Sequence, residues 1–154
     1  MANTYTKIYL HLIFAVKGRV SLISPLFQGR IYDYMCKVVI SMGHDIVALG
    51  GIENHVHLLI RYNPAQQLSE LVRELKVSTT KMINTNKLSM GKFGWQRGYG
   101  CFSHSPSQVC GVTKYINNQY DKRQDNTQNH IGIAYSKNAS EQIIVYVGIY
   151  SRCH

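Results

Sequence analysis

The chain has 154 residues, and its 17 Lys and Arg against 8 Asp and Glu give a formal net charge of +9. The length fits one domain of about 100–200 residues, and a hydrophobic content of 45% excludes a wholly disordered chain. The longest apolar stretch, 8–16, is interrupted by His11 and is too short to span a bilayer. The N-terminus lacks the basic and apolar regions of a signal peptide, so we expect a cytoplasmic protein with no membrane partner.

The position of the charge is more informative than its total. No acidic residue lies between Glu74 and Asp121. The basic residues of this stretch are Lys76, Lys81, Lys87, Lys92, Arg97 and Lys114. Such a run of one sign predicts a continuous positive surface that binds a polyanion, most often nucleic acid. The alternative is a basic protein whose charge serves only solubility.

The first half of the chain predicts a strand, a helix and a hairpin. Residues 5–16 alternate between apolar and polar, as in a half-buried strand. Ser24 and Pro25 form a helix start signal, and apolar residues then recur at helical spacing up to Gly43. The apolar runs 46–49 and 54–62 lie close together in sequence and predict an antiparallel pair joined near 50–53.

The second half predicts a helix over 66–86, a short strand over 99–103, and a third helix that a capping box opens at Ser105 and Gln108. The first six elements therefore follow the split βαβ order of an α+β, ferredoxin-like (RRM-like) fold. This fold has an antiparallel sheet with two helices on one face and leaves its other face open. The third helix is an addition to that pattern.

The C-terminal part differs in composition. Residues 121–130 are polar and predict a linker, whereas 143–150 are apolar and predict a strand whose partner the sequence does not indicate. We therefore divide the chain into a domain over 1–123 and a divergent tail over 124–154. The cysteines show no zinc-ligand spacing and are expected to be reduced, small, buried apolar residues.

The most specific local feature is the sequence His55-Val56-His57 in the second strand of the hairpin. Residues two apart on a strand point to the same face, so both imidazoles are presented together, close enough to bind one metal ion. The alternative is a polar, solvated sheet face with no ligand. Histidine-triad hydrolases and metallo-β-lactamase-type zinc sites require further ligands at positions that are Leu59 and Ile60 here.

A two-histidine site needs a third ligand, and the third helix offers Gln119. Tyr115 and Gln119 are four residues apart and therefore share a helix face. A glutamine oxygen suits Mg²⁺ or Mn²⁺, and a tyrosine beside a metal-bound phosphate can act as a covalent nucleophile. The alternative is that Tyr115, one of 11 tyrosines, is a packing residue.

These residues resemble the single-tyrosine transposases of the HUH superfamily, which include the insertion-sequence transposase A proteins and the REP-associated tyrosine transposases. The resemblance covers 5–119. It rests on HLIFAVK at 11–17, GG at 50–51, HVHLL at 55–59, LK at 75–76, WQRGYG at 95–100, FS at 102–103 and YINNQ at 115–119.

The resemblance implies the following roles. His55, His57 and Gln119 would hold the metal, and Tyr115 would attack a DNA phosphate, become linked to a 5′-phosphate and free a 3′-hydroxyl. Members of this family act as dimers on single-stranded DNA with hairpins, and the tyrosine helix can complete the partner's site. The family pattern ends at Gln119 here, so the tail bears on helix docking and dimer exchange more than on the reaction.

Other residues keep more than one interpretation. His11 is expected on the face of the histidine pair, where it supports that pair, contacts DNA or is simply polar. Three aromatic side chains are expected either to stack on unpaired bases or to pack inside their own loop: Trp95, Tyr99 and Phe102. For the whole protein, the alternatives to a transposase are a hairpin-binding module that does not cut, and an HUH endonuclease of the replication-initiator or relaxase type.

Overall fold

We describe the protein from a computed structural model, in which residues 3–119, 132–135 and 144–147 are described. Two 3₁₀ turns, Lys17–Arg19 and Pro106–Gln108, accompany the regular helices and strands. The main elements are β1 (Ile8–Ala15), α1 (Pro25–Ser41), β2 (Asp45–Ile52), β3 (His55–Tyr62), α2 (Leu68–Thr85), β4 (Gly100–His104), α3 (Val109–Asn117), β5 (Gly132–Tyr135) and β6 (Ile144–Val147).

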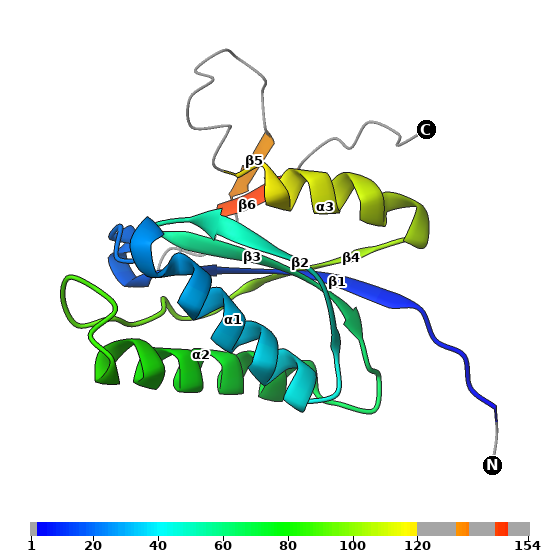
Figure 1. Cartoon of the computed structure of the whole chain (residues 1–154). Helices are drawn as coiled ribbons and strands as arrows, with labels where there is room; N and C mark the ends of the chain where they lie inside the picture. The colour runs from blue at the N-terminus through cyan, green and yellow to red at the C-terminus, as the bar shows by residue number, and fades with distance from the viewer. Residues whose placement is uncertain (1–2, 120–131, 136–143, 148–154) are drawn as a thin grey trace.

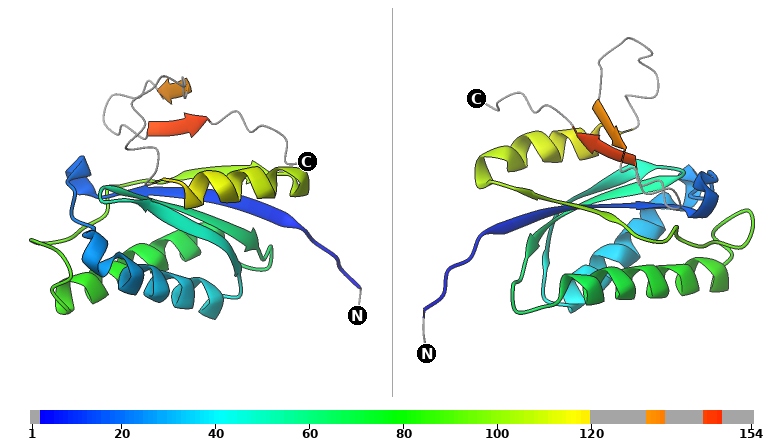
Figure 2. Two further views of the ribbon diagram at one scale, coloured as in Figure 1. Left: turned by 45° about the horizontal axis from the view of Figure 1, so that its top comes forward. Right: turned by 180° about the vertical axis from the view of Figure 1, so that it is seen from behind.

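The first four strands form one antiparallel sheet in the order β2-β3-β1-β4. Helices α1 and α2 cover one face, and α3 lies across the other face (Figure 1; Figure 2 shows the same layers from two further sides). The predicted ferredoxin-like α+β fold is therefore confirmed. The expectation of an open second face is wrong, because α3 packs on it.

The alternation of β1 and β3 explains the main core. Leu12 and Phe14 of β1 lie beside Val56 and Leu58 of β3, and all four are buried against the helices. Burial of each such side chain stabilises a fold by about 1.5–3 kcal/mol relative to leaving it exposed. This layer holds α1 and α2 in place.

A second, smaller core lies under α3. It consists of Ala48 from β2, Leu59 from β3, and Val112 and Ile116 from α3, all of them buried. Because both faces of the sheet are covered, every residue of β3 from His55 to Ile60 is buried. The strand therefore lacks the exposed polar face that its sequence predicts.

Local signals place the helix ends. The Ser24 hydroxyl accepts a hydrogen bond from the Leu26 N–H at 3.3 Å, and Gly43 has a φ of 86° just after α1, so both predicted boundaries are confirmed. The predicted capping box is also formed: the Ser105 N–H donates to Gln108 Oε1 at 3.0 Å. It opens a 3₁₀ turn that leads into α3.

The C-terminal predictions are tested only in part. The apolar run yields β6, and its partner is β5, with Ile133 opposite Tyr146. The predicted polar linker and the proposed boundary at residue 123 lie outside the described residues. Among the described residues, Cys36, Cys101 and Cys110 form no disulfide; Cys110 is exposed and the other two are half-buried, so the expectation of buried cysteines is wrong. No helix in the described part of the chain is long and apolar enough to cross a membrane.

Candidate active site

Three histidines from two neighbouring strands meet on the sheet face under α3. His55 and His57 come from β3, and their ring centroids are 5.0 Å apart. His11 comes from β1, where it stands opposite Leu59, and its ring centroid lies 5.1 Å from that of His57. Directly paired residues on neighbouring strands share a face, so the alternation of both strands brings the three rings together.

This cluster is buried. His11, His55 and His57 expose 2%, 6% and 0% of their surface. Burial, with a smaller contribution from the charge of Arg19, lowers the pKa of His55 to about 4, against the opposing effect of its side-chain hydrogen bond with Gln119. Burial also lowers the pKa of His11 to about 4, with a smaller contribution from His104. Both imidazoles are therefore neutral near pH 7.

Hydrogen bonds fix the orientation of the two β3 histidines. His55 Nδ1 donates to the amide oxygen of Asn54 at 2.7 Å, because that oxygen only accepts. His57 Nδ1 and His11 Nε2 form a hydrogen bond of 2.9 Å. In each β3 histidine, Nδ1 is thus held by a neighbouring side chain, as is typical of metal-binding imidazoles.

Helix α3 brings the tyrosine and the glutamine to the same place. The Tyr115 ring centroid lies 5.6 Å from that of His57 and 6.5 Å from that of His11. Gln119, in the turn after α3, donates from Nε2 to the Tyr115 carbonyl at 3.0 Å and forms a side-chain hydrogen bond with His55. One chain thus brings Tyr115, His55, His57 and Gln119 together, with His11 beside them.

A further histidine, His104, lies near this cluster and is not among the residues predicted from the sequence. Its ring centroid lies 5.9 Å from that of His11, and burial lowers its pKa. The predicted strand over 99–103 stops one residue short, whereas β4 extends to His104 and pairs it with Tyr9. An extension of the alternation by one residue would have placed His104 on the face of His11.

The donor set fits a hard divalent ion bound by nitrogen and oxygen. In the described residues, no group of three or more His, Cys, Asp or Glu side chains is arranged to hold a metal; His55 and His57 offer nitrogen atoms, and Gln119 beside them offers an amide oxygen. Asn54 binds His55 Nδ1, so a metal would have to use the lone pair of Nε2. The low pKa of His55 keeps that lone pair available at neutral pH.

The basic residues of the acid-free stretch lie in different layers of the fold. Lys81 and Lys87 lie on α2 and just after it, in the layer on the other side of the sheet from Tyr115. Lys76 donates to the carbonyls of Gln96, at 2.9 Å, and Gly98, so its ammonium group holds the loop before β4.

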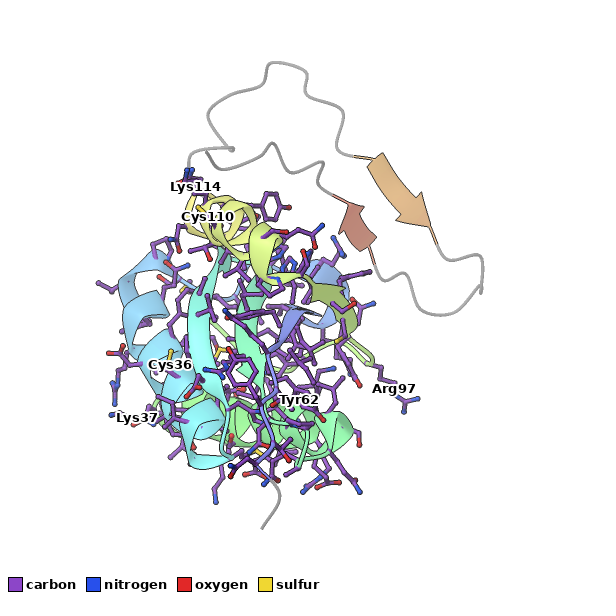
Figure 3. The ribbon with its side chains drawn as sticks, turned by 90° about the vertical axis from the view of Figure 1, so that its right-hand side faces the viewer. Cys36, Lys37, Tyr62, Arg97, Cys110 and Lys114 are labelled. Atoms are coloured by element: carbon purple, nitrogen blue, oxygen red, sulfur yellow. The ribbon has the colours of Figure 1, made fainter. Side chains whose placement is uncertain are left out.

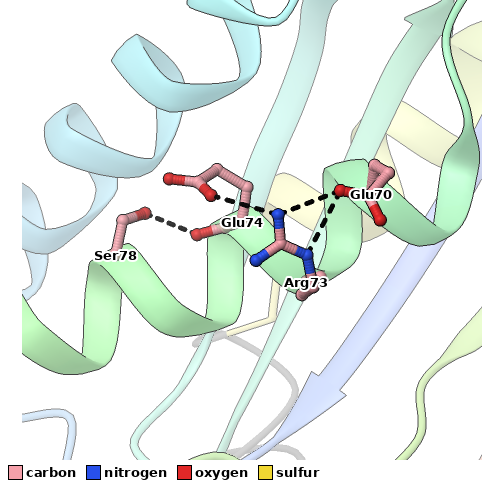
Figure 4. Close-up of polar contacts among 4 residues, drawn as sticks. All are labelled: Glu70, Arg73, Glu74 and Ser78. Atoms are coloured by element: carbon pink, nitrogen blue, oxygen red, sulfur yellow. Dashed lines mark hydrogen bonds and ion pairs between the residues drawn. The ribbon is translucent and has the colours of Figure 1, made fainter.

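The remaining basic side chains are exposed but separated. Lys92 and Arg97 lie in the connection between α2 and β4, whereas Lys114 lies on α3. Figure 3 shows Arg97 and Lys114 on different parts of the surface. On α2, Arg73 partly neutralises two carboxylates: it binds Glu70 at 2.9 Å and approaches Glu74 at 3.9 Å (Figure 4). Of the predicted DNA contacts, Lys114 is the one on the helix of Tyr115.

The aromatic side chains before β4 pack inside the molecule. Trp95 Nε1 donates to Thr79 Oγ1 at 2.8 Å, and the Trp95 ring meets Phe93 edge-on at 4.9 Å between centroids. Tyr99 is partly buried against the same core. For Trp95 the structure favours internal packing over base stacking, while Phe102 remains half-buried on β4.

Comparison with known proteins identifies the family. The model of the family described as "Transposase IS200 like" matches residues 4–119, which include every element from β1 to α3 and end at Gln119. The chain belongs to this family. The ISDra2 transposase TnpA of Deinococcus radiodurans is similar to this IS200-like transposase, with 25% identity over 118 residues, 73% of this chain and 84% of that protein.

Two solved structures share the fold of this IS200-like transposase. One, from Deinococcus radiodurans R1, is described as a transposase and has a TM-score of 0.60 and 23% identity, over 77% of this chain and 95% of that chain. The other is a REP-associated tyrosine transposase bound to a REP hairpin. It has a TM-score of 0.60 and 16% identity, over 80% of this chain and 73% of that chain. The match of the family model confirms the predicted family, and the protein is a DNA-processing enzyme of the transposase type.

Proposed function

We propose that this transposase cuts and rejoins single-stranded DNA at hairpin-marked ends, with Tyr115 as the nucleophile. The observation that supports this most directly is the position of Tyr115, whose ring centroid lies 5.6 Å from that of His57. A tyrosine hydroxyl beside a cluster of buried nitrogen donors suits nucleophilic attack on a phosphate diester. The i,i+4 hydrogen bond from Gln119 to the Tyr115 carbonyl couples the nucleophile to the proposed third ligand.

In the proposed cleavage step, the Tyr115 hydroxyl oxygen attacks a phosphorus atom of the DNA backbone. A bond forms between Tyr115 and the 5′-phosphate, and the bond from phosphorus to the 3′ oxygen of the preceding nucleotide breaks. Tyr115 gives up its phenolic proton and the departing 3′ oxygen takes one up, so no net proton is consumed. Rejoining is the reverse: a 3′-hydroxyl attacks the phosphotyrosine and releases Tyr115.

We propose that His55, His57 and Gln119 hold Mg²⁺ or Mn²⁺. When bound, such an ion polarises the phosphate and stabilises the charge that develops on its oxygens. The residues of the chain prepare this site: Asn54 orients His55 through a 2.7 Å hydrogen bond, and His11 orients His57 through one of 2.9 Å. Because His11 is only 2% exposed, it is better suited to orient His57 than to contact DNA.

Hairpin DNA is the proposed partner because a solved protein with the same fold was bound to a REP hairpin. Lys114 is exposed on α3 and directly precedes Tyr115 in the sequence, so of the six basic residues predicted to bind DNA from the acid-free stretch it is the one proposed to meet a backbone phosphate near the nucleophile. We also predict a homodimer. We propose that Tyr115 acts with the histidines of its own chain, since its ring centroid lies 5.6 Å from that of His57 within one chain; exchange of α3 between subunits is the alternative.

Incubation of the full chain with hairpin-bearing single-stranded DNA and Mg²⁺ or Mn²⁺ tests the proposal. We expect a covalent protein–DNA adduct, which peptide mapping assigns to Tyr115. The variant Tyr115→Phe should abolish the adduct. Tyr34→Phe is the matched control, because Tyr34 lies on α1 in the opposite layer, and it should leave the adduct yield unchanged.

The possible outcomes separate the competing functions. An adduct that persists in Tyr115→Phe would contradict the assignment of the nucleophile. Tight binding of the hairpin with no cleavage in either metal would favour a binding module that does not cut. Cleavage only of DNA that lacks hairpins would favour an HUH endonuclease of the replication-initiator or relaxase type.

A further inference from the structure

Helix α3 rests on β2 at a glycine. Gly50 of β2 is paired with His57 of β3, so it lies in the strand directly beside the histidine cluster. A Cβ atom built at Gly50 would overlap the carbonyl oxygen of Ile116, and it would lie 3.1 Å from Ile116 Cγ2 and 3.2 Å from the Ile116 carbonyl carbon. The backbone of α3 therefore occupies the space that any side chain at position 50 would need.

Space, and not backbone conformation, requires glycine at this position. Gly50 does not have the positive φ that marks Gly18, Gly43 and Gly98. An alanine could therefore adopt the backbone angles of Gly50 without strain. The obstacle is the main chain of α3, which cannot rotate away as the end of a flexible side chain could.

The next glycine has a different environment. A Cβ at Gly51 would overlap the carbonyl oxygen of His55 within the same hairpin and would lie 3.1 Å from the Tyr32 hydroxyl of α1. Gly51 therefore faces the hairpin and the α1 layer, whereas Gly50 faces α3. Of the two neighbouring glycines, only Gly50 bears on the position of the tyrosine helix.

We propose that Gly50 is a positioning residue for Tyr115. Because Gly50 has no side chain, the α3 backbone lies directly on β2. Tyr115 immediately precedes Ile116, so the contact between Gly50 and Ile116 sets the distance of the tyrosine from His57. The small core of Ala48, Leu59, Val112 and Ile116 then holds α3 at that distance. The effect of Gly50 on catalysis rests on the function proposed above. The packing of α3 on Gly50 does not depend on that function.

The variant Gly50→Ala tests the proposal. Relief of the overlap requires α3 to move away from the sheet, and a misplacement of roughly 1 Å can lower a rate about 100-fold. We therefore expect the rate of adduct formation to fall by about that factor, with faster hydrogen exchange of the α3 amides and unchanged exchange in α1 and α2. Gly29→Ala is the matched control, since a Cβ at Gly29 meets nothing within 4 Å.

A second variant, Val112→Ala, loosens α3 without any change in β2. It should also speed hydrogen exchange in α3, to a smaller extent than Gly50→Ala. Normal α3 protection in Gly50→Ala would overturn the proposal, and so would unfolding of the whole variant, because the three atoms nearest to the new Cβ all belong to Ile116. A wild-type chain that forms no adduct would refute the proposed function, while hydrogen exchange would still decide the role of Gly50.

Discussion

His11 allows a quantitative test of how the proposed metal site is oriented. The variant His11→Phe keeps a planar ring of similar size in a buried position but removes the 2.9 Å hydrogen bond to His57 Nδ1. A buried donor or acceptor that loses its partner costs about 1–3 kcal/mol of stability. Loss of the neighbour that orients a ligating histidine lowers metal affinity about 10–100-fold. We therefore expect both a moderate fall in stability and a loss of Mn²⁺ affinity within that range.

Isothermal titration with Mn²⁺ and urea unfolding measure the two effects. His44→Phe is the matched control: His44 is also a buried histidine, with Nδ1 accepting from the Asn63 N–H at 3.0 Å and its ring stacked on Tyr62. It should lose stability and keep its Mn²⁺ affinity. Equal Mn²⁺ affinity in wild type and His11→Phe would refute the argument that His11 orients His57.

Two further predictions concern charge. Lys114→Ala should weaken binding of single-stranded DNA and reduce the slope of log affinity against log salt by about 0.7. Lys76→Ala should leave that slope unchanged, because the Lys76 ammonium group binds two carbonyls. Fluorescence anisotropy over a salt series measures both slopes. The free energy of unfolding should fall as the pH drops from about 6.5 to about 4, because the unfolded state takes up protons that the folded His11 and His55 do not bind. Each of the two histidines contributes a slope of about 1.4 kcal/mol per pH unit in that window, and urea unfolding at several pH values would contradict this if stability stayed constant.

The sheet and its two covering helices follow from local patterns. Alternation in β1 and β3 and helical spacing in α1 and α2 are properties of neighbouring residues, so the sequence alone predicts them. The order of the elements then restricts the topology, because few arrangements join two such βαβ units with short connections. The boundaries shift by a few residues, and the shift at His104 hides one member of the histidine cluster.

The covered sheet face was harder to predict, although one signal was present. Leu59 lies on the same face as His55 and His57, and Ala48 stands opposite it on β2. An apolar pair on a face that also holds histidines needs a cover, and the apolar stripe of α3 supplies it through Val112. Periodicity defines that stripe but does not say which surface it meets, because the pairing depends on contacts between residues far apart in sequence.

The positions of the basic residues in space also depend on contacts that local sequence patterns do not predict. Charge along a sequence is one-dimensional, whereas α2 and α3 lie on opposite faces of the sheet. A lysine also has a long stem and can turn its ammonium group inward, as Lys76 does toward the carbonyls of Gln96 and Gly98. An acid-free stretch therefore predicts a basic protein but not a basic face.

Tyr115 could be selected among 11 tyrosines because two local constraints agree there with the family resemblance. It lies at the edge of an apolar helix stripe, which fixes the direction of its ring, and it is one helical turn before Gln119, which pairs it with a polar neighbour. Neither constraint defines the distance to His57. That distance depends on how closely two backbones approach at Gly50 and Ile116, and only a glycine in a neighbouring strand permits that approach. The geometry of the proposed nucleophile is thus determined as much by an absent side chain on β2 as by the residues of α3.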